Sequence, residues 1–173
     1  MSNLIPEILI GFRVYEGGNH YVGVADVELP KLETMTETIK GAGIAGEVEV
    51  AVLGQLSAMN AKLNWRITTK DTLRLAAPKV HELVLRGSAQ YHDSGTGELE
   101  TSALRIALRG RSKSVDPGKF DAAATMDAST EFSLTYLKID YDGQTMIEYD
   151  PLAYKYVVDG VDYLAGVRKD LGV

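Results

Sequence analysis

Residues 41–46 have the spacing of a phosphate-binding loop. They read Gly-Ala-Gly-Ile-Ala-Gly, which matches the G-x-G-x-x-G pattern that cradles a dinucleotide pyrophosphate. That chemistry needs a buried strand before the glycines and a helix after them. Residues 33–40 are polar, however, and residues 47–52 alternate with the period of a strand. We therefore expect the glycines to form a hinge that leads into a long β-hairpin, and we predict no cofactor site.

Other residue types capable of chemistry do not form a recognisable group. The three histidines, His20, His81 and His92, lie in different predicted strands or turns, so a metal site is not predicted. The chain has no cysteine, and none of its serines lies in a G-x-S-x-G motif. Carboxylates are abundant, but nothing in their spacing selects one pair for acid–base catalysis. We predict no catalytic residue, no metal site and no enzymatic activity.

Tyrosine is the one residue type that gathers in part of the sequence. Most of the nine tyrosines lie in the last third of the chain. They are Tyr136, Tyr141, Tyr149, Tyr154, Tyr156 and Tyr163. Exposed tyrosines serve as carbohydrate platforms, and they also suit sheet faces and contacts between subunits. We favour packing and subunit contacts.

Length and charge limit the class of protein. A chain of 173 residues is long enough for one domain with a substantial core. Its net charge of -6 argues against a dedicated nucleic-acid binder, although an acidic surface can lie beside DNA without holding it. The first residues lack the basic and apolar regions of a signal peptide, and no apolar run is long enough for a membrane helix. We expect synthesis in the cytoplasm.

Two elements are predicted next to the glycine hinge. Residues 41–67 are expected to form the hinge and an extended hairpin, with a turn at Gly54-Gln55. Its return strand places Met59, Ala61, Leu63, Trp65 and Ile67 on one face. Residues 68–77 then read as a short helix that Thr68 caps and that ends before Pro78.

The rest of the pattern predicts a mainly β domain over residues 1–173. The stretch 129–141 reads as the longest strand, and its apolar residues change face between Tyr136 and Leu137, which indicates a bulge or bend. Asp142-Gly143 follows as a hairpin turn, and residues 163–168 can hold one helical turn. Altogether the sequence predicts eight or nine strands and one or two short helices. We expect a β-barrel or sandwich with a flanking short α-helix and an extended hairpin.

Several segments, taken together and in order, resemble one protein family. They are residues 29–32, 41–50, 115–118, 136–143, 147–151 and 159–173. The chain is similar to the major tail tube proteins of contractile-tailed bacteriophages and of the R-type phage tail-like bacteriocins (tailocins). The resemblance spans nearly the whole length and is most specific in the last forty or so residues.

The resemblance implies a mechanical role. Such proteins form hexameric rings that stack into a rigid tube, whose inner wall is a continuous β-barrel, inside a contractile sheath. Sheath contraction drives the tube through the envelope of the target cell, and the tube conducts DNA in a phage or ions in a tailocin. The implied partners are other copies of the chain, the sheath protein, and baseplate and tail terminator proteins. The expected location is a virion tail or an extracellular tailocin particle.

On this interpretation, Glu47 and Glu49 are candidates for the lumen, where negative charge would repel DNA phosphates. The candidates for subunit contacts are Gly41, Gly43, Gly46, Met59, Tyr149, Tyr154, Tyr163, Leu164 and Leu171. Two alternatives stay open. One is the inner tube of a type VI-like injection system that carries protein effectors. The other is a monomeric β-sandwich that binds or hydrolyses carbohydrate through the tyrosines.

Overall fold

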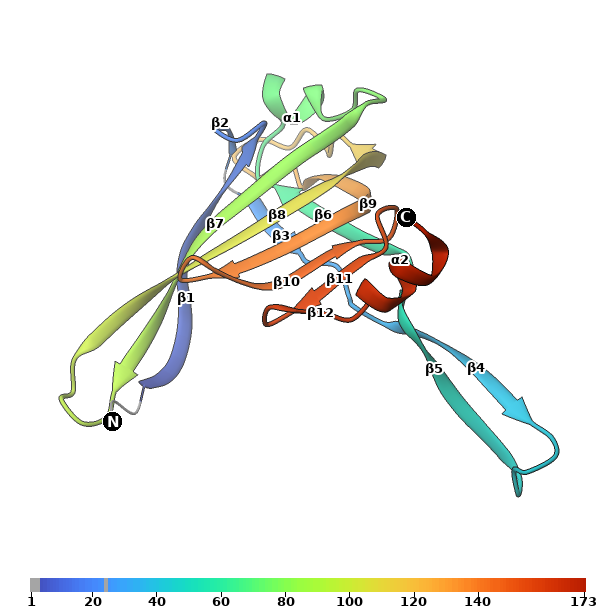
Figure 1. Ribbon diagram of the computed structural model, residues 1–173. Coiled ribbons are helices and arrows are strands. Elements are labelled where there is room, and N and C mark those ends of the chain that lie inside the picture. The colour runs from blue at the N-terminus through green and yellow to red at the C-terminus, as the bar shows by residue number, and fades with distance from the viewer. Residues whose placement is uncertain (1–3, 24) are drawn as a thin grey trace.

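The computed structural model describes residues 4–23 and 25–173, and it is built almost entirely of antiparallel strands (Figure 1). In chain order the elements are β1 (Leu4–Glu16), β2 (His20–Gly23), β3 (Ala25–Glu28), β4 (Thr34–Lys40), β5 (Glu47–Leu56), β6 (Met59–Trp65), α1 (Lys70–Arg74), β7 (Val80–Asp93), β8 (Leu99–Asp116), β9 (Ala128–Tyr141), β10 (Gln144–Asp150), β11 (Lys155–Val158), β12 (Val161–Asp162) and α2 (Ala165–Leu171). Neither helix is long and apolar enough to cross a membrane. The predicted class, mainly β with a short flanking helix and an extended hairpin, is confirmed.

One large sheet contains ten of the strands. Its main path runs β12-β11-β10-β9-β8-β7-β1-β2, and β6 joins it by pairing with β9 on one side and β3 on the other. The remaining two strands, β4 and β5, pair only with each other. Figure 1 shows this β4–β5 hairpin projecting from the body. Strands β1, β7 and β8 also run past the body together and form a second projection (Figure 1).

The bend in β9 allows this strand to pair with two different strands along the same edge. Its first half pairs with β6 from Ala128 to Leu134, and its second half pairs with β10 from Leu137 to Tyr141. The register with β8 shifts between these halves, because Arg109 opposes Tyr136 while Gly110 opposes Leu134. The predicted change of face is therefore confirmed as a bulge that leaves Thr135 unpaired against β8.

The core lies on one face of the large sheet, where buried residues of β6 and the first half of β9 cluster with those of β7 and β8. Alternate residues of β6 and of the first half of β9 are buried, as expected for strands that cover a core on one face. Phe132 and Leu63 are fully buried there, together with Leu83 and Leu108 from β7 and β8. The indole N–H of Trp65 donates to the Thr130 hydroxyl at 3.1 Å, so this buried polar pair is satisfied.

The predicted pairing of the hairpin in residues 41–67 is wrong. Residues 34–40, whose polar sequence did not indicate a buried strand, form the exposed strand β4, and they pair with β5 in a hairpin whose tip is residues 41–46. Strand β6 does not return along β5 but pairs with β3 and β9. The physical reason is that the apolar face of β6 supplies the core, whereas Val48 and Val50 of β5 stay exposed.

Two smaller predictions also need correction. Within the predicted 68–77 helix only Lys70–Arg74 is helical, and the cap is Thr69 rather than Thr68, since Thr69 exchanges hydrogen bonds with Thr72 in a capping box. The longest strand is β8 rather than the stretch 129–141, because β8 continues beyond the body. The predicted C-terminal turn is present as α2.

Candidate assembly surfaces

The β4–β5 hairpin, which we call the two-stranded arm (residues 34–53), has no core of its own. Every residue of β4 and the first five residues of β5 are exposed. The register places Ile39 opposite Val48 on one face, and Val50 lies on that face too. These three side chains are each at least 40% exposed. A two-stranded ribbon with an uncovered apolar face is marginal in water, so this arm calls for a partner surface.

The other face of the two-stranded arm is polar and carries the predicted lumen residues. Glu47 lies opposite Lys40, and their charged groups are 3.4 Å apart. Glu49 lies opposite Thr38 and accepts a hydrogen bond of 2.6 Å from the Thr36 hydroxyl. Both carboxylates are exposed on one face of the arm, as the alternation of residues 47–52 predicted.

The predicted contact glycines lie at the tip of the same arm. Gly41, Gly43 and Gly46 have φ values of 145°, 90° and 128°, which is backbone that favours glycine. No atom lies within 4 Å of the place where a Cβ would be added, so the glycines serve the turn rather than close packing within the subunit. The tip is thus open to another molecule.

The root of the two-stranded arm is fixed by the C-terminal part of the chain. Gly54 has a φ of 65°, and a Cβ there would lie 2.5 Å from the Leu164 side chain. Two residues further, Leu56 N–H donates to the Tyr149 hydroxyl at 3.3 Å. Because Leu164 and Tyr149 are buried in these contacts, they set the direction in which the arm leaves the body.

This packing corrects part of the predicted contact set. Met59, Tyr149 and Leu164 are each less than 5% exposed, so they pack within the subunit and offer no surface to a neighbour. Their apolar or amphipathic side chains, which suggested an interface, complete the subunit's own interior instead. Tyr154, Tyr163 and Leu171 are between 42% and 55% exposed and remain candidates.

A second projection, which we call the three-stranded arm (residues 4–12 and 87–104), was not predicted. It consists of the outer parts of β1, β7 and β8. Its exposed apolar side chains are Leu4, Ile5, Ile8, Leu9, Ile10 and Leu99. A signal was present in the sequence, because residues 4–10 carry apolar side chains at both parities, a pattern typical of strands covered on both faces. The subunit itself provides no such cover.

The outward face of the sheet at β9–β11 is held by a charged network. Asp140 contacts Arg105 at 3.2 Å and accepts from the Thr145 hydroxyl at 2.8 Å. Burial opposes ionisation of Asp140, but hydrogen bonds from Thr145 and Lys138 outweigh it and hold its pKa below the ordinary value. This network satisfies the charges within the subunit rather than preparing them for a reaction.

Tyr136 and Glu148 form the second half of the network. The Tyr136 hydroxyl donates to Glu148 at 3.0 Å, and Lys155 contacts the same carboxylate at 2.8 Å. Burial, followed by the Glu148 carboxylate, raises the pKa of Tyr136 to about 12. For Glu148, burial is outweighed by the bonds from Lys155 and Tyr136, so its pKa lies below the ordinary value.

The histidines are placed apart, as the sequence indicated. His81 is fully buried, with Nδ1 2.5 Å from Glu16 and Nε2 3.0 Å from the Ala77 carbonyl oxygen. His20 lies 3.1 Å from Asp71 at the surface. Within residues 4–23 and 25–173 no group of three or more His, Cys, Asp or Glu side chains is arranged to hold a metal ion.

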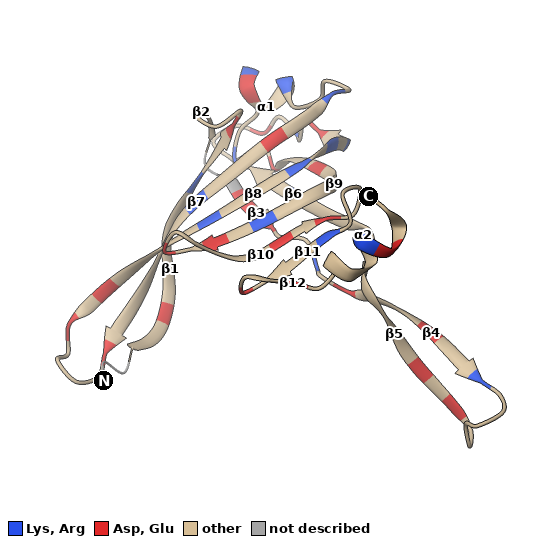
Figure 2. Ribbon diagram, viewed as in Figure 1, with Lys and Arg blue, Asp and Glu red and all other residues tan. Residues whose placement is uncertain are grey.

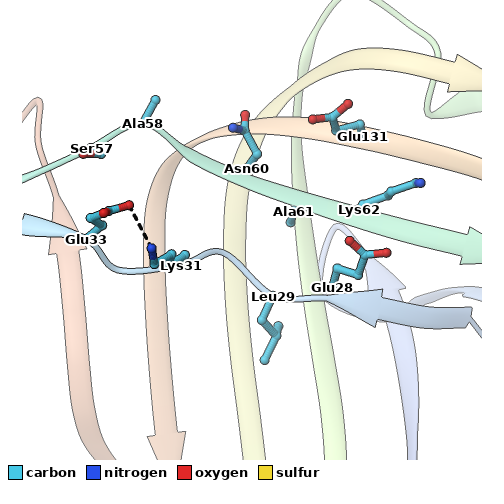
Figure 3. A pocket seen from close by; sticks show the side chains of 10 residues that line it. All are labelled: Glu28, Leu29, Lys31, Glu33, Ser57, Ala58, Asn60, Ala61, Lys62 and Glu131. Atoms are coloured by element: carbon cyan, nitrogen blue, oxygen red, sulfur yellow. Dashed lines mark hydrogen bonds and ion pairs between the residues drawn. The ribbon is translucent and has the colours of Figure 1, made fainter.

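A hollow lies beside the part of the β6 edge that β3 leaves unpaired (Figure 3). It has a volume of about 500 Å³ and opens between β6 and the segment that joins β3 to β4. Strand β3 pairs with β6 only from Lys62 to Trp65. After β3 the chain leaves the edge of β6, and its next backbone hydrogen bond to this region is the one that the Glu33 carbonyl oxygen accepts from Ser57 N–H at 2.7 Å. The hollow is lined by charged side chains such as Lys31 and Glu28 next to a strand edge that β3 leaves unpaired, which suits a protein contact better than an enclosed ligand.

Comparison with known proteins gives a consistent result. A family model described as "Phage tail tube protein FII" matches residues 6–172. The chain is 29% identical over 172 residues to the tail tube protein of Escherichia phage P2, covering 98% of this chain and 99% of that protein. It is 27% identical over 157 residues to the major tail tube protein of Serratia phage KSP20, covering 90% of each. A solved extracellular contractile injection system, the PVC sheath-tube complex in its extended state, contains a chain with a TM-score of 0.46 and 15% identity, over 76% of this chain and 87% of that one.

Proposed function

Because the chain belongs to the phage tail tube protein FII family, we propose that it is a structural subunit and not an enzyme. Its copies associate into hexameric rings, and the rings stack into the rigid inner tube of a contractile tail. The observation that carries this proposal is the pair of arms. Both expose apolar strand residues that a lone copy leaves in water, and identical neighbours are the simplest molecules to cover them.

The contacts within and between rings are proposed to use the open parts of the subunit. The tip of the two-stranded arm approaches a neighbouring copy closely at Gly41, Gly43 and Gly46, because these three residues carry no side chain. Tyr154, Tyr163 and Leu171 present exposed apolar surface near α2 for a second contact. Large, partly apolar contacts of this kind would keep the tube from separating under load.

The acidic face of the two-stranded arm is proposed to border the lumen. Glu47 and Glu49 are exposed on the same face, and Lys40, opposite Glu47, is the one basic residue of this arm. A wall that repeats two carboxylates per copy would repel the phosphates of DNA, so a genome could slide through without binding. In a tailocin the same bore would pass ions. The sheath, baseplate and tail terminator proteins are the further proposed partners.

Assembly of the purified protein tests the proposal. We expect concentration-dependent growth in analytical ultracentrifugation and hollow tubes by negative-stain electron microscopy. The double variant Val48→Asp/Val50→Asp should remain monomeric, because it places charges on the apolar face of the arm. Leu73→Asp is the matched control, since Leu73 is 49% exposed on α1 and belongs to neither arm. A wild-type protein that stays monomeric at high concentration, with no hollow assembly, would overturn the proposal.

A further inference from the structure

Charge is divided between the two ends of the three-stranded arm. The arm contains four acidic residues, Glu7, Asp93, Glu98 and Glu100, and residues 4–12 and 87–104 include no lysine or arginine. Figure 2 shows this acidic projection beside basic bands that begin where the same strands enter the body. Two of the acids, Glu98 and Glu100, are exposed near the tip. A single element therefore has an acidic tip and a basic root.

The basic root is a row of three arginines. Arg13 of β1 lies opposite Arg86 of β7, which lies opposite Arg105 of β8, so all three share one face of the sheet. Like charges directly across neighbouring strands destabilise a sheet. Among the described residues, only Arg105 of the three contacts a carboxylate, that of Asp140 at 3.2 Å. Arg13 and Arg86 retain positive charge that the subunit does not neutralise.

Two tyrosines hold these arginines in place. The Arg86 guanidinium stacks over the Tyr15 ring at 4.7 Å, and that of Arg13 lies 5.7 Å from the Tyr21 ring centre. The two rings meet edge to face at 5.9 Å. We call Arg13, Tyr15, Tyr21, Arg86 and Arg105 the Arg–Tyr patch. Arginine and tyrosine are enriched at the energetically important centres of protein interfaces, so this surface has the composition of a binding site.

We infer that the Arg–Tyr patch of one copy binds the acidic tip of the three-stranded arm of a second copy. The inference rests on the proposed stacking and assigns the contact that joins successive rings. Glu98 and Arg105 are seven positions apart on the β8 side of the arm, roughly 20 Å along an extended chain, so one arm cannot bind its own root. A tip-to-root contact is heterologous and repeats without closing, as an open-ended tube requires. The exposed Leu99 and Ile8 would add apolar contact beside the charges.

Charge reversal at the patch tests the inference. In Arg13→Glu/Arg86→Glu, we expect rings to form but the mean tube length to fall at least about tenfold, as expected when an interface charge pair becomes repulsive. The matched control is Lys79→Glu/Arg111→Glu, which makes the same charge change at exposed positions outside the patch and should leave tube length unchanged. Thermal unfolding of both variants shows whether the subunit still folds.

Reversal at the tip gives an independent test that does not touch the patch. Glu98→Lys/Glu100→Lys changes two side chains that make no hydrogen bond or ion pair with the described residues, and it should shorten the tubes similarly. Combining tip and patch reversals restores the attraction and should recover long tubes. Tube length that is insensitive to either reversal, or that the combination fails to rescue, overturns the inference.

Two further outcomes are distinguishable. If the wild-type protein forms no tubes, the proposed function fails before this contact is tested. If the patch reversal leaves tube length unchanged but abolishes binding of a duplex DNA fragment, the patch is a nucleic-acid surface and the inference is wrong. Raising the salt concentration should shorten wild-type tubes, because the charges involved are exposed to screening.

Discussion

The β6–β9 ladder and the β4–β5 ladder are both antiparallel and both alternate apolar and polar side chains, yet they differ in what covers the apolar face. In β6–β9, Leu63 and Phe132 are fully buried in a core that also contains residues of β7 and β8. In β4–β5, Val48 and Val50 face solvent. Alternation therefore identifies a face that needs cover, but it does not say whether the cover comes from the same chain or from another copy.

The largest expected effect lies on the covered side of this comparison. Phe132→Ala should lower the free energy of unfolding of the monomer by about 3–5 kcal/mol, because it leaves a cavity in the core where Phe132 packs. Chemical denaturation monitored by circular dichroism measures the loss. Phe120→Ala is the control, since Phe120 is 96% exposed and its removal should change stability by less than about 0.5 kcal/mol. Equal effects at the two sites would break the distinction between covered and uncovered regions.

The junction of the two regions should show the next largest effect. Gly54→Ala should cost roughly 1–3 kcal/mol, because alanine is strained at a φ of 65° and its Cβ would collide with Leu164. Gly43→Ala isolates the backbone contribution, since Gly43 has a φ of 90° but open space around it. Adding Leu164→Ala to Gly54→Ala should recover the part of the stability loss that is caused by the collision with the Leu164 side chain. A double-mutant cycle measures this recovery. Additive losses in the cycle would mean that the two residues do not meet.

The charged network on the outward face should make the stability of the covered region depend on pH. Since the pKa values of Asp140 and Glu148 are lowered in the folded chain, their stabilising effect is present at neutral pH and is lost as the pH falls below the ordinary carboxyl range. The raised pKa of Tyr136 affects stability at alkaline pH, because the folded state holds the phenolic proton more tightly than the unfolded state does. Stability should therefore also fall as the pH rises from about 10 to about 12. Denaturation of the monomer at each pH measures this, and Tyr136→Phe should flatten the alkaline limb.

The smallest effect on the monomer is expected at the uncovered face. Ile39→Ser/Val48→Ser should change the free energy of unfolding by less than about 0.5 kcal/mol, because these side chains are exposed in the lone subunit. The same change should abolish or greatly slow assembly, which light scattering follows in time. A large loss of monomer stability would show that the arm is covered within its own chain after all.

Much of the architecture could be predicted from the sequence. Periodicity predicted most of the strands, although not β4, and the change of face after Tyr136 predicted the bulge. Six segments, most specifically those in the last forty or so residues, predicted membership of the tail tube family, which the family match confirms. Strand pairing could not be predicted, because the pattern of residues 47–67 satisfies a hairpin as well as it satisfies two strands with different partners. For the same reason, Met59, Tyr149 and Leu164 could not be told from interface residues without knowing what buries them.

Strands β7 and β8 pass from the tip of the three-stranded arm into the core without a break. Their cross-strand hydrogen bonds lie perpendicular to the chain direction, so a push along the arm loads the bonds in parallel, in shear, rather than peeling them open one at a time. A force that enters at the arm is thus carried by continuous covalent backbone to the buried core, to which β7 and β8 contribute Leu83 and Leu108. The stiffness of an assembled column would then depend on strand length as much as on the area of contact between its rings.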